Sequence, residues 1–175
     1  MSTSMLRKVS SLLLMVAPLM VAGCGDDDDP PGPGNGSFSA TVTGDISATI
    51  SGQALSGFAT GENAFGMTFV TSDGRYGVVF VRTGARPGNG TYTVGDQAGD
   101  FAVIVTFDPT PQNATNDDDM LFAATSGQIT ITNSSGTGVT GTFSFDAEDF
   151  TGASTISVTG SFQSRCIAQS GFSCT

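Results

Sequence analysis

The 175-residue sequence contains no histidine and no tryptophan, and its single lysine is Lys8. Without histidine, one chain cannot build a Ser-His-Asp or Cys-His catalytic arrangement, an HExxH zinc site or a histidine proton shuttle. The six basic residues face 16 acidic ones, which gives a net charge of −10. Phosphate binding requires clustered lysine and arginine, so no nucleic-acid partner is expected.

Strong helix formers are also scarce in the body of the chain. From Phe38 onward, threonine, serine, glycine and β-branched residues predominate, a composition that favours strands over helices. Its surface must be built from Thr, Ser, Asn, Gln and Asp, which is typical of extracellular proteins. The length and the low charged fraction of 13% suit one globular domain, which we assign to residues 38–175.

The N-terminus has the features of an export signal. Residues 1–8 (MSTSMLRK) carry two positive charges, and residues 9–23 (VSSLLLMVAPLMVAG) are apolar but shorter than the roughly 20 residues that cross a bilayer. We therefore predict a signal peptide over residues 1–23. A transmembrane anchor or a buried helix is the alternative, but aspartates follow instead of a stop-transfer flank. Loss of Arg7 and Lys8 by cleavage would change the net charge from −10 to −12.

The apolar run ends in Val21-Ala22-Gly23-Cys24, which resembles the lipobox of bacterial lipoproteins. The resemblance implies cleavage after Gly23, a diacylglycerol on the Cys24 thiol and an acyl group, such as palmitate, on the new amino group. A thiol is the nucleophilic side chain best suited to form such a thioether. Two or three acyl chains give stable anchoring, so a membrane is the expected partner.

Residues 24–37 form the predicted tether between this anchor and the body. The stretch GDDDDPPGPGNGS has no periodic apolar residues and would span about 20 Å when flexible and up to roughly 40 Å when extended. Four adjacent aspartates, Asp26 to Asp29, lack the alternating ligands of a calcium loop. Acidic residues after a lipidated cysteine resemble those of surface-displayed lipoproteins. In the enterobacterial sorting rule, aspartate directly after the cysteine retains a lipoprotein at the inner membrane, and Gly25 in that position does not fit retention. We expect the outer membrane, facing the cell surface, with a periplasm-facing position as the alternative.

The body reads as short strands separated by glycine, asparagine and aspartate turns. This pattern predicts an all-β fold, either an antiparallel β-sandwich or a curled, barrel-like sheet of about eight to ten strands. The candidate strands span residues 38–42, 46–50, 65–70, 76–81, 90–94, 101–107, 127–132, 139–145 and 155–162.

Alternation in the later strands separates two faces. Phe143, Phe145 and Val158 fall on an apolar face, and Thr142 and Thr159 on a polar one. Strands 76–81 and 101–107 are apolar on both faces, which suits strands covered on both sides or lying centrally in a curled sheet. Residues 38–163 resemble an uncharacterised family of Gly/Thr-rich β-domains in bacterial lipoproteins, a resemblance that implies the fold class and no activity. The pair VTGTF and VTGSF is interpreted as two neighbouring strands and not as a repeat array.

Cys166 and Cys174 remain once Cys24 is assigned to lipid. An even remainder in an exported protein predicts a disulfide, which would stabilise the fold by roughly 2–3 kcal/mol. A metal site would need further ligands, and a catalytic thiol would need a histidine base.

Carboxylates offer the main route to catalysis. Glu62, Asp146, Glu148 and Asp149 could supply the pair used by glycan hydrolases, although the stretch 146–154 reads as a solvated turn between strands. Sugar-cleaving sites also usually contain aromatic platforms, and tryptophan is missing.

The longest predicted loop, residues 107–122, contains the best calcium candidate in the body. Asn116, Asp117, Asp118 and Asp119 provide oxygen ligands but lack the spacing and the glycine of an EF-hand, so an exposed acidic loop is the simpler interpretation.

Arg75, Arg82 and Arg86 are close in sequence, but an anion site would need them on one face. We interpret them as solvated turn and strand-edge charges, and we predict no cofactor.

The sequence thus predicts a lipid-anchored envelope protein with a non-catalytic binding or structural role. A ligand or extracellular partner of unknown identity would be met by loops at one end of the fold, residues 107–122 first. A carboxylate-dependent glycan-acting enzyme is the alternative.

Overall fold

The computed structural model describes residues 36–110, 119–169 and 171–174. All regular elements in these ranges are strands, and they join in one ten-stranded sheet. The strands are β1 (Ser37–Gly44), β2 (Ala48–Ala59), β3 (Ala64–Thr71), β4 (Tyr76–Thr83), β5 (Gly90–Thr93), β6 (Ala102–Phe107), β7 (Met120–Ser135), β8 (Gly138–Asp149), β9 (Thr155–Cys166) and β10 (Phe172–Ser173).

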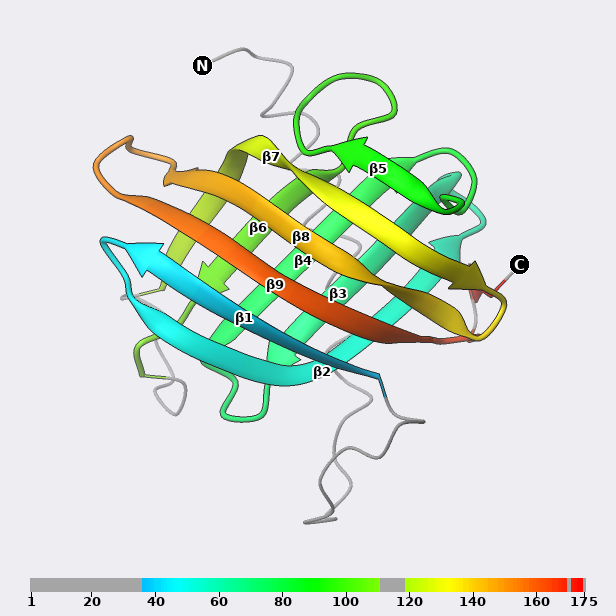
Figure 1. The fold of residues 1–175 in the computed structure, drawn as a ribbon, viewed down its shortest axis with the longest axis horizontal. Helices are drawn as coiled ribbons and strands as arrows, with labels where there is room; N and C mark the ends of the chain where they lie inside the picture. The colour runs from blue at the N-terminus through cyan, green and yellow to red at the C-terminus, as the bar shows by residue number, and fades with distance from the viewer. Residues whose placement is uncertain (1–35, 111–118, 170, 175) are drawn as a thin grey trace. The chain divides into compact units, whose positions relative to one another are not determined.

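The sheet closes on itself as an up-and-down β-barrel (Figure 1). Strands β1, β2, β3, β4, β6, β7, β8 and β9 each pair antiparallel with the next strand of this series. The last strand, β9, then returns to β1 over eight residue pairs, from Ser37↔Gln163 to Gly44↔Ile156. Of the two architectures that the sequence left open, the protein adopts the closed barrel.

Two short strands, β5 and β10, cover edge segments of the long strands β7 and β2. β5 pairs with Gln128–Ile131 of β7, beyond the part of β7 that β6 occupies. β10 pairs with Phe58 and Ala59 of β2, beyond the residues that β1 and β9 occupy. Because a free edge exposes unpaired backbone groups, both short strands protect the barrel wall.

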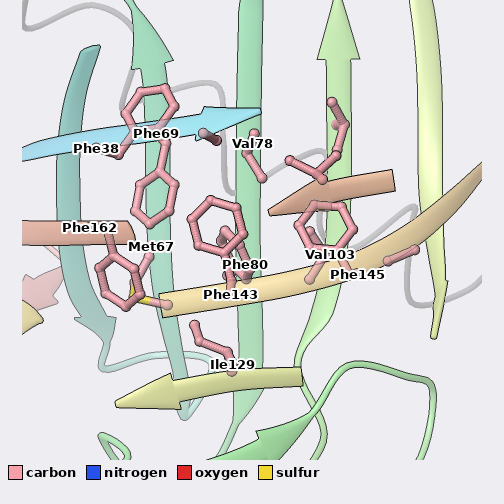
Figure 2. Packing of buried hydrophobic residues seen from close by; sticks show 14 of the residues in the cluster. Phe38, Met67, Phe69, Val78, Phe80, Val103, Ile129, Phe143, Phe145 and Phe162 are labelled. Carbon is pink, nitrogen blue, oxygen red and sulfur yellow. The ribbon is translucent and has the colours of Figure 1, made fainter. Parts of the chain in front are cut away.

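Phenylalanine rings and aliphatic side chains together fill the barrel interior (Figure 2). Phe69 lies at the centre, with ring centroids 5.2 Å from those of Phe38, Phe80 and Phe162 and 5.8 Å from that of Phe143. Such aromatic pairs stabilise a core beyond the area they bury. The predicted inward faces of the later strands are confirmed, and Thr142 and Thr159 are exposed as expected.

Glycines on neighbouring strands make room for these rings. Four inward phenylalanines each lie directly opposite a glycine, in the pairs Phe38↔Gly52, Phe145↔Gly127, Phe162↔Gly141 and Phe143↔Gly160. The VTGTF and VTGSF stretches are therefore neighbouring antiparallel strands, as predicted, and each supplies a glycine for the other's ring. Their similarity reflects one packing requirement that occurs twice.

Some strands extend further than the sequence predicted. The candidate at residues 46–50 is only the start of β2, which continues through SGQALSGFA to Ala59. β7 begins at Met120 and contains a bulge between Ala124 and Ser126, so the predicted loop 107–122 was too long. Glycine and serine in residues 51–59 gave that stretch a turn-like composition, which the long cross-strand ladders of β2 override.

The structure joins Cys166 to Cys174 in a disulfide, as the sequence predicted, with 5.7 Å between the Cα atoms. Cys166 ends β9 and Cys174 follows β10. The bond therefore ties the short tail strand to the barrel at the place where β10 covers the edge of β2.

The glycine requirement gives a test. A Cβ at residue 160 would lie 2.5 Å from the Ser39 carbonyl oxygen and 2.7 Å from the Phe143 ring, whereas one at residue 61 would meet nothing within 4 Å. We expect Gly160→Ala to lower the free energy of unfolding by about 1–3 kcal/mol, because backbone and ring must shift. Gly61→Ala is the matched control and should change it by less than about 0.5 kcal/mol, measured by denaturant unfolding. Equal effects of the two substitutions would contradict the packing argument.

Candidate functional site

A groove of about 510 Å³ opens at one end of the barrel. It lies between the β1–β2 turn (residues 45–47) and the β3–β4 turn (residues 72–75), and we call this end of the barrel the groove end. The opposite end, where β1 begins and β9 ends, is the tail end. Residues lining the groove include Ile46, Ile50, Asp73, Arg75, Tyr76 and Phe107.

An aromatic pair forms the floor of the groove. Tyr76 of β4 and Phe107 of β6 are cross-strand partners, and their rings stack with centroids 4.8 Å apart. Both side chains pack against the outermost layer of the barrel core. Burial raises the pKa of the Tyr76 phenol, which therefore stays neutral at physiological pH.

Arg75 connects the β3–β4 turn to the segment that follows β6. Its Nη2 donates to the Pro109 carbonyl oxygen at 2.8 Å, and its own carbonyl oxygen accepts the Asp108 N–H at 2.8 Å. The sequence placed the main binding loop at residues 107–122. Arg75 fixes the first residues of that loop beside the groove.

Asp73 shapes the turn itself. Its Oδ1 accepts hydrogen bonds from the Thr71 hydroxyl and from the Arg75 N–H, the latter at 3.1 Å. These bonds, the one from Thr71 foremost, hold the pKa of the Asp73 carboxyl below its ordinary value of 3.8. Asp73 is thus a fixed negative charge on the rim of the groove.

The opposite rim is held in the same way. Thr155 donates its N–H to the Asp45 carboxylate at 2.7 Å, and Asp45 donates its N–H to the Thr155 carbonyl oxygen at 3.0 Å. The β1–β2 turn is therefore anchored to the start of β9. Both rims are organised before any ligand arrives, which lowers the entropic cost of binding.

The predicted lipidation and calcium sites fall largely outside the described residues. Cys24, with the rest of residues 1–35, lies outside them, and so do Asn116, Asp117 and Asp118. Asp119 is described and exposed just before β7. Within the described ranges, no group of three or more His, Cys, Asp or Glu side chains could hold a metal ion.

Three of the candidate catalytic carboxylates, Asp146, Glu148 and Asp149, lie together at the end of β8, whereas Glu62 lies apart from them. Glu62 lies in the β2–β3 turn at the tail end, whereas Asp149 ends β8 at the groove end, so these two cannot form a pair. Asp146 accepts hydrogen bonds from the hydroxyls of Ser157, at 2.6 Å, and Ser126, at 3.3 Å, on the outer face of the sheet. Glu148 is exposed on that face.

Asp149 organises the β8–β9 turn. Its Oδ1 accepts the N–H groups of Thr151 and Ala153 at 3.0 and 2.9 Å and the Thr151 hydroxyl at 2.9 Å. Desolvation acts to raise the pKa of this carboxyl, but the hydrogen bonds from Thr151, Ala153 and Gly152 outweigh it and hold the pKa below 3.8. A carboxylate held ionised in this way is a poor general acid.

The three clustered arginines do not share a face. Arg75 lies at the groove end, whereas Arg82 and Arg86 lie toward the tail end. Arg82 stacks over the Tyr92 ring, 5.3 Å from its centroid, and donates to the Gly99 carbonyl oxygen at 2.8 Å. The interpretation of all three as solvated charges is wrong for Arg86, whose Nε and Nη1 atoms are buried. Nothing in the local sequence distinguishes Arg86 from its neighbours.

No protein-family model, curated protein or solved structure matches this sequence. In the described part of the chain, no helix is long and apolar enough to cross a membrane.

The structural role of Asp149 predicts a pH effect. Because the pKa of Asp149 is lower in the folded protein than its ordinary value of 3.8, the ionised carboxylate stabilises the fold. This contribution is complete at pH values above 3.8 and is lost as the pH falls through the folded-state pKa. We expect Asp149→Asn to lower the melting temperature at pH 7, and the difference from wild type to shrink below pH 3.8. Glu148→Gln, at the adjacent exposed position, is the control and should behave as wild type. A pH-independent difference for Asp149→Asn would contradict this account.

Proposed function

We propose that this protein is a bacterial lipoprotein, anchored to the outer membrane by acyl chains on Cys24, whose barrel binds an envelope or extracellular ligand without chemical conversion. Support for the anchor comes from Val21-Ala22-Gly23-Cys24 after a charged and an apolar segment. The groove with its preformed rims carries the binding part of the proposal. The body faces the cell surface in this proposal, with a periplasm-facing position as the alternative.

The groove suits a ligand with one flat apolar face and several polar groups. Tyr76 and Phe107 offer aromatic surface, and Asp73 and Arg75 offer a fixed acceptor and a donor beside it. This combination is typical of sites that orient a small organic ligand through a few polar contacts. A second depression of about 460 Å³, at the tail end, is lined by Asn133, Gln163 and Arg165 and has no aromatic residue. It is therefore the weaker candidate.

A glycan-acting enzyme would be the second function, and a ligandless coat protein the third. The described carboxylates do not favour a glycan-acting enzyme, because Asp146 and Asp149 accept hydrogen bonds from hydroxyl and backbone donors on the outer surface. The groove favours binding over a coat, since a coat component requires no preformed recess.

The anchor is tested with the full-length protein in a diderm bacterium. We expect wild type in the membrane fraction, with acyl chains on the peptide that begins at Cys24, and Cys24→Ser in the soluble fraction. Protease treatment of intact cells should degrade the body if it faces outward. Protection until the outer membrane is opened would support the periplasm-facing alternative. Replacement of Asp26 to Asp29 by serine tests whether these residues direct surface display.

The groove is tested by filling it. Thr49 is exposed on β2 and lines the groove, whereas Thr142 is an equally exposed threonine on β8, away from it. Ligands would first be sought with the detergent-solubilised lipoprotein on a glycan array and in pull-downs from envelope extracts. We expect Thr49→Trp to weaken binding at least about tenfold and Thr142→Trp to leave it unchanged. Equal binding by both variants would contradict the groove assignment, and an absence of any ligand would favour a structural role.

A further inference from the structure

Arg86 is a half-buried cation that pairs with no carboxylate of the described residues. Its Nε and Nη1 atoms are buried without a hydrogen-bond partner, and its guanidinium lies 5.7 Å from the centroid of the Phe65 ring. Its remaining described contact is a hydrogen bond from Nη2 to the Cys166 Sγ atom at 3.5 Å. Burial lowers the pKa of Arg86, but an arginine remains charged at neutral pH.

A disulfide sulfur is a weak acceptor, so this contact only partly satisfies the guanidinium. If the disulfide is reduced, the same sulfur can become a thiolate, which is a full negative charge at hydrogen-bond distance from Arg86. A neighbouring arginine favours the thiolate form of a cysteine. Among the described residues, the guanidinium of Arg86 therefore gains a counter-ion only when the disulfide is reduced.

We propose that Cys166–Cys174 is a thiol–disulfide exchange site for an external dithiol, with Cys166 as the leaving-group sulfur and Arg86 as the residue that positions and stabilises its thiolate. A purely structural disulfide requires no cation beside one of its sulfurs. This inference concerns the tail end of the barrel and is independent of the ligand groove at the other end.

The exchange balances as two displacement steps. One thiolate of the dithiol attacks Cys174 Sγ and forms a mixed disulfide with it, while the Cys166–Cys174 bond breaks and its electron pair remains on Cys166 beside Arg86. The second thiolate of the reagent then attacks the reagent's own sulfur in the mixed disulfide, and Cys174 leaves as a thiolate that takes up a proton. The protein gains two electrons and the dithiol becomes a disulfide. Attack at Cys174 is favoured over attack at Cys166, because a leaving thiolate of lower pKa departs faster.

Exchange would also free the tail of the chain. Cys174 follows β10, which is held to β2 by the pairs Phe172↔Ala59 and Ser173↔Phe58. Once the bond to Cys166 is broken, β10 keeps these two pairings and the nearby hydrogen bond from the Thr60 N–H to the Gly171 carbonyl oxygen at 3.2 Å, but no covalent link to β9. The proposed reaction therefore acts on the place where the barrel wall is completed by its shortest strand.

The first experiment measures the redox equilibrium of the full-length protein in buffers of reduced and oxidised dithiothreitol. We expect Arg86→Gln to make the disulfide about tenfold harder to reduce, a shift of about 30 mV for a two-electron couple. Arg165→Gln is the matched control, because Arg165 adjoins Cys166 in sequence but is exposed. An unchanged equilibrium in Arg86→Gln, or an equal shift in both variants, would overturn the proposal.

The second experiment keeps Arg86 in place, so its result does not depend on the folding of an Arg86 variant. The rate of alkylation by iodoacetamide is followed against pH for Cys166 in Cys174→Ser and for Cys174 in Cys166→Ser, with peptide mass spectrometry identifying each site. We expect the midpoint for Cys166 to lie at least one pH unit below that for Cys174, whose thiol should titrate near the usual value of about 8.5. A midpoint for Cys166 equal to or above that of Cys174 would overturn the proposal.

Discussion

The packing of phenylalanine rings against glycines on neighbouring strands is the constraint on which the barrel depends. An eight-stranded barrel is just wide enough for side chains to fill its interior. Here phenylalanine rings lie at the centre of the interior, and Phe143 and Phe162 each occupy space that the glycine of the other strand leaves free. Each of these inward rings thus has a glycine directly opposite it on the neighbouring strand. This matching explains why two stretches 19 residues apart have nearly the same sequence.

A filled interior determines where binding can occur. In barrels of this size that hold a ligand, small inward side chains leave a central cavity, whereas Phe69 and its neighbours occupy the centre of this one. In the proposed binding role, recognition would therefore take place at the ends of the barrel, where turns connect the strands. At the groove end, Tyr76 belongs to the core and Phe107 packs against it, and their stacked rings line the groove. The same pair thus contributes to stability and offers a surface for a ligand.

The sequence predicted which faces of the later strands are buried, but it did not predict which strands pair with one another. Alternation identified the inward residues of the later strands, and the cysteine count predicted the disulfide. Closure of the sheet rests on β1 meeting β9, a pairing of distant segments that no local pattern encodes. Composition misled at β2, where SGQALSGFA looks like a turn but is held by β1, β3, β9 and β10. The groove and the half-buried Arg86 depend on such long-range contacts, so neither could be predicted from spacing alone.

The even number of barrel strands has a consequence for the proposed anchor. In an up-and-down barrel, the first strand begins and the last strand ends at the same end when their number is even. Ser37, where the tether would enter, and Cys166 therefore share the tail end, and the groove opens at the other. The disulfide and Arg86 therefore lie at the end of the barrel where β1 begins. The groove lies at the opposite end, so a ligand in it would not compete for space with Ser37, the first residue of β1.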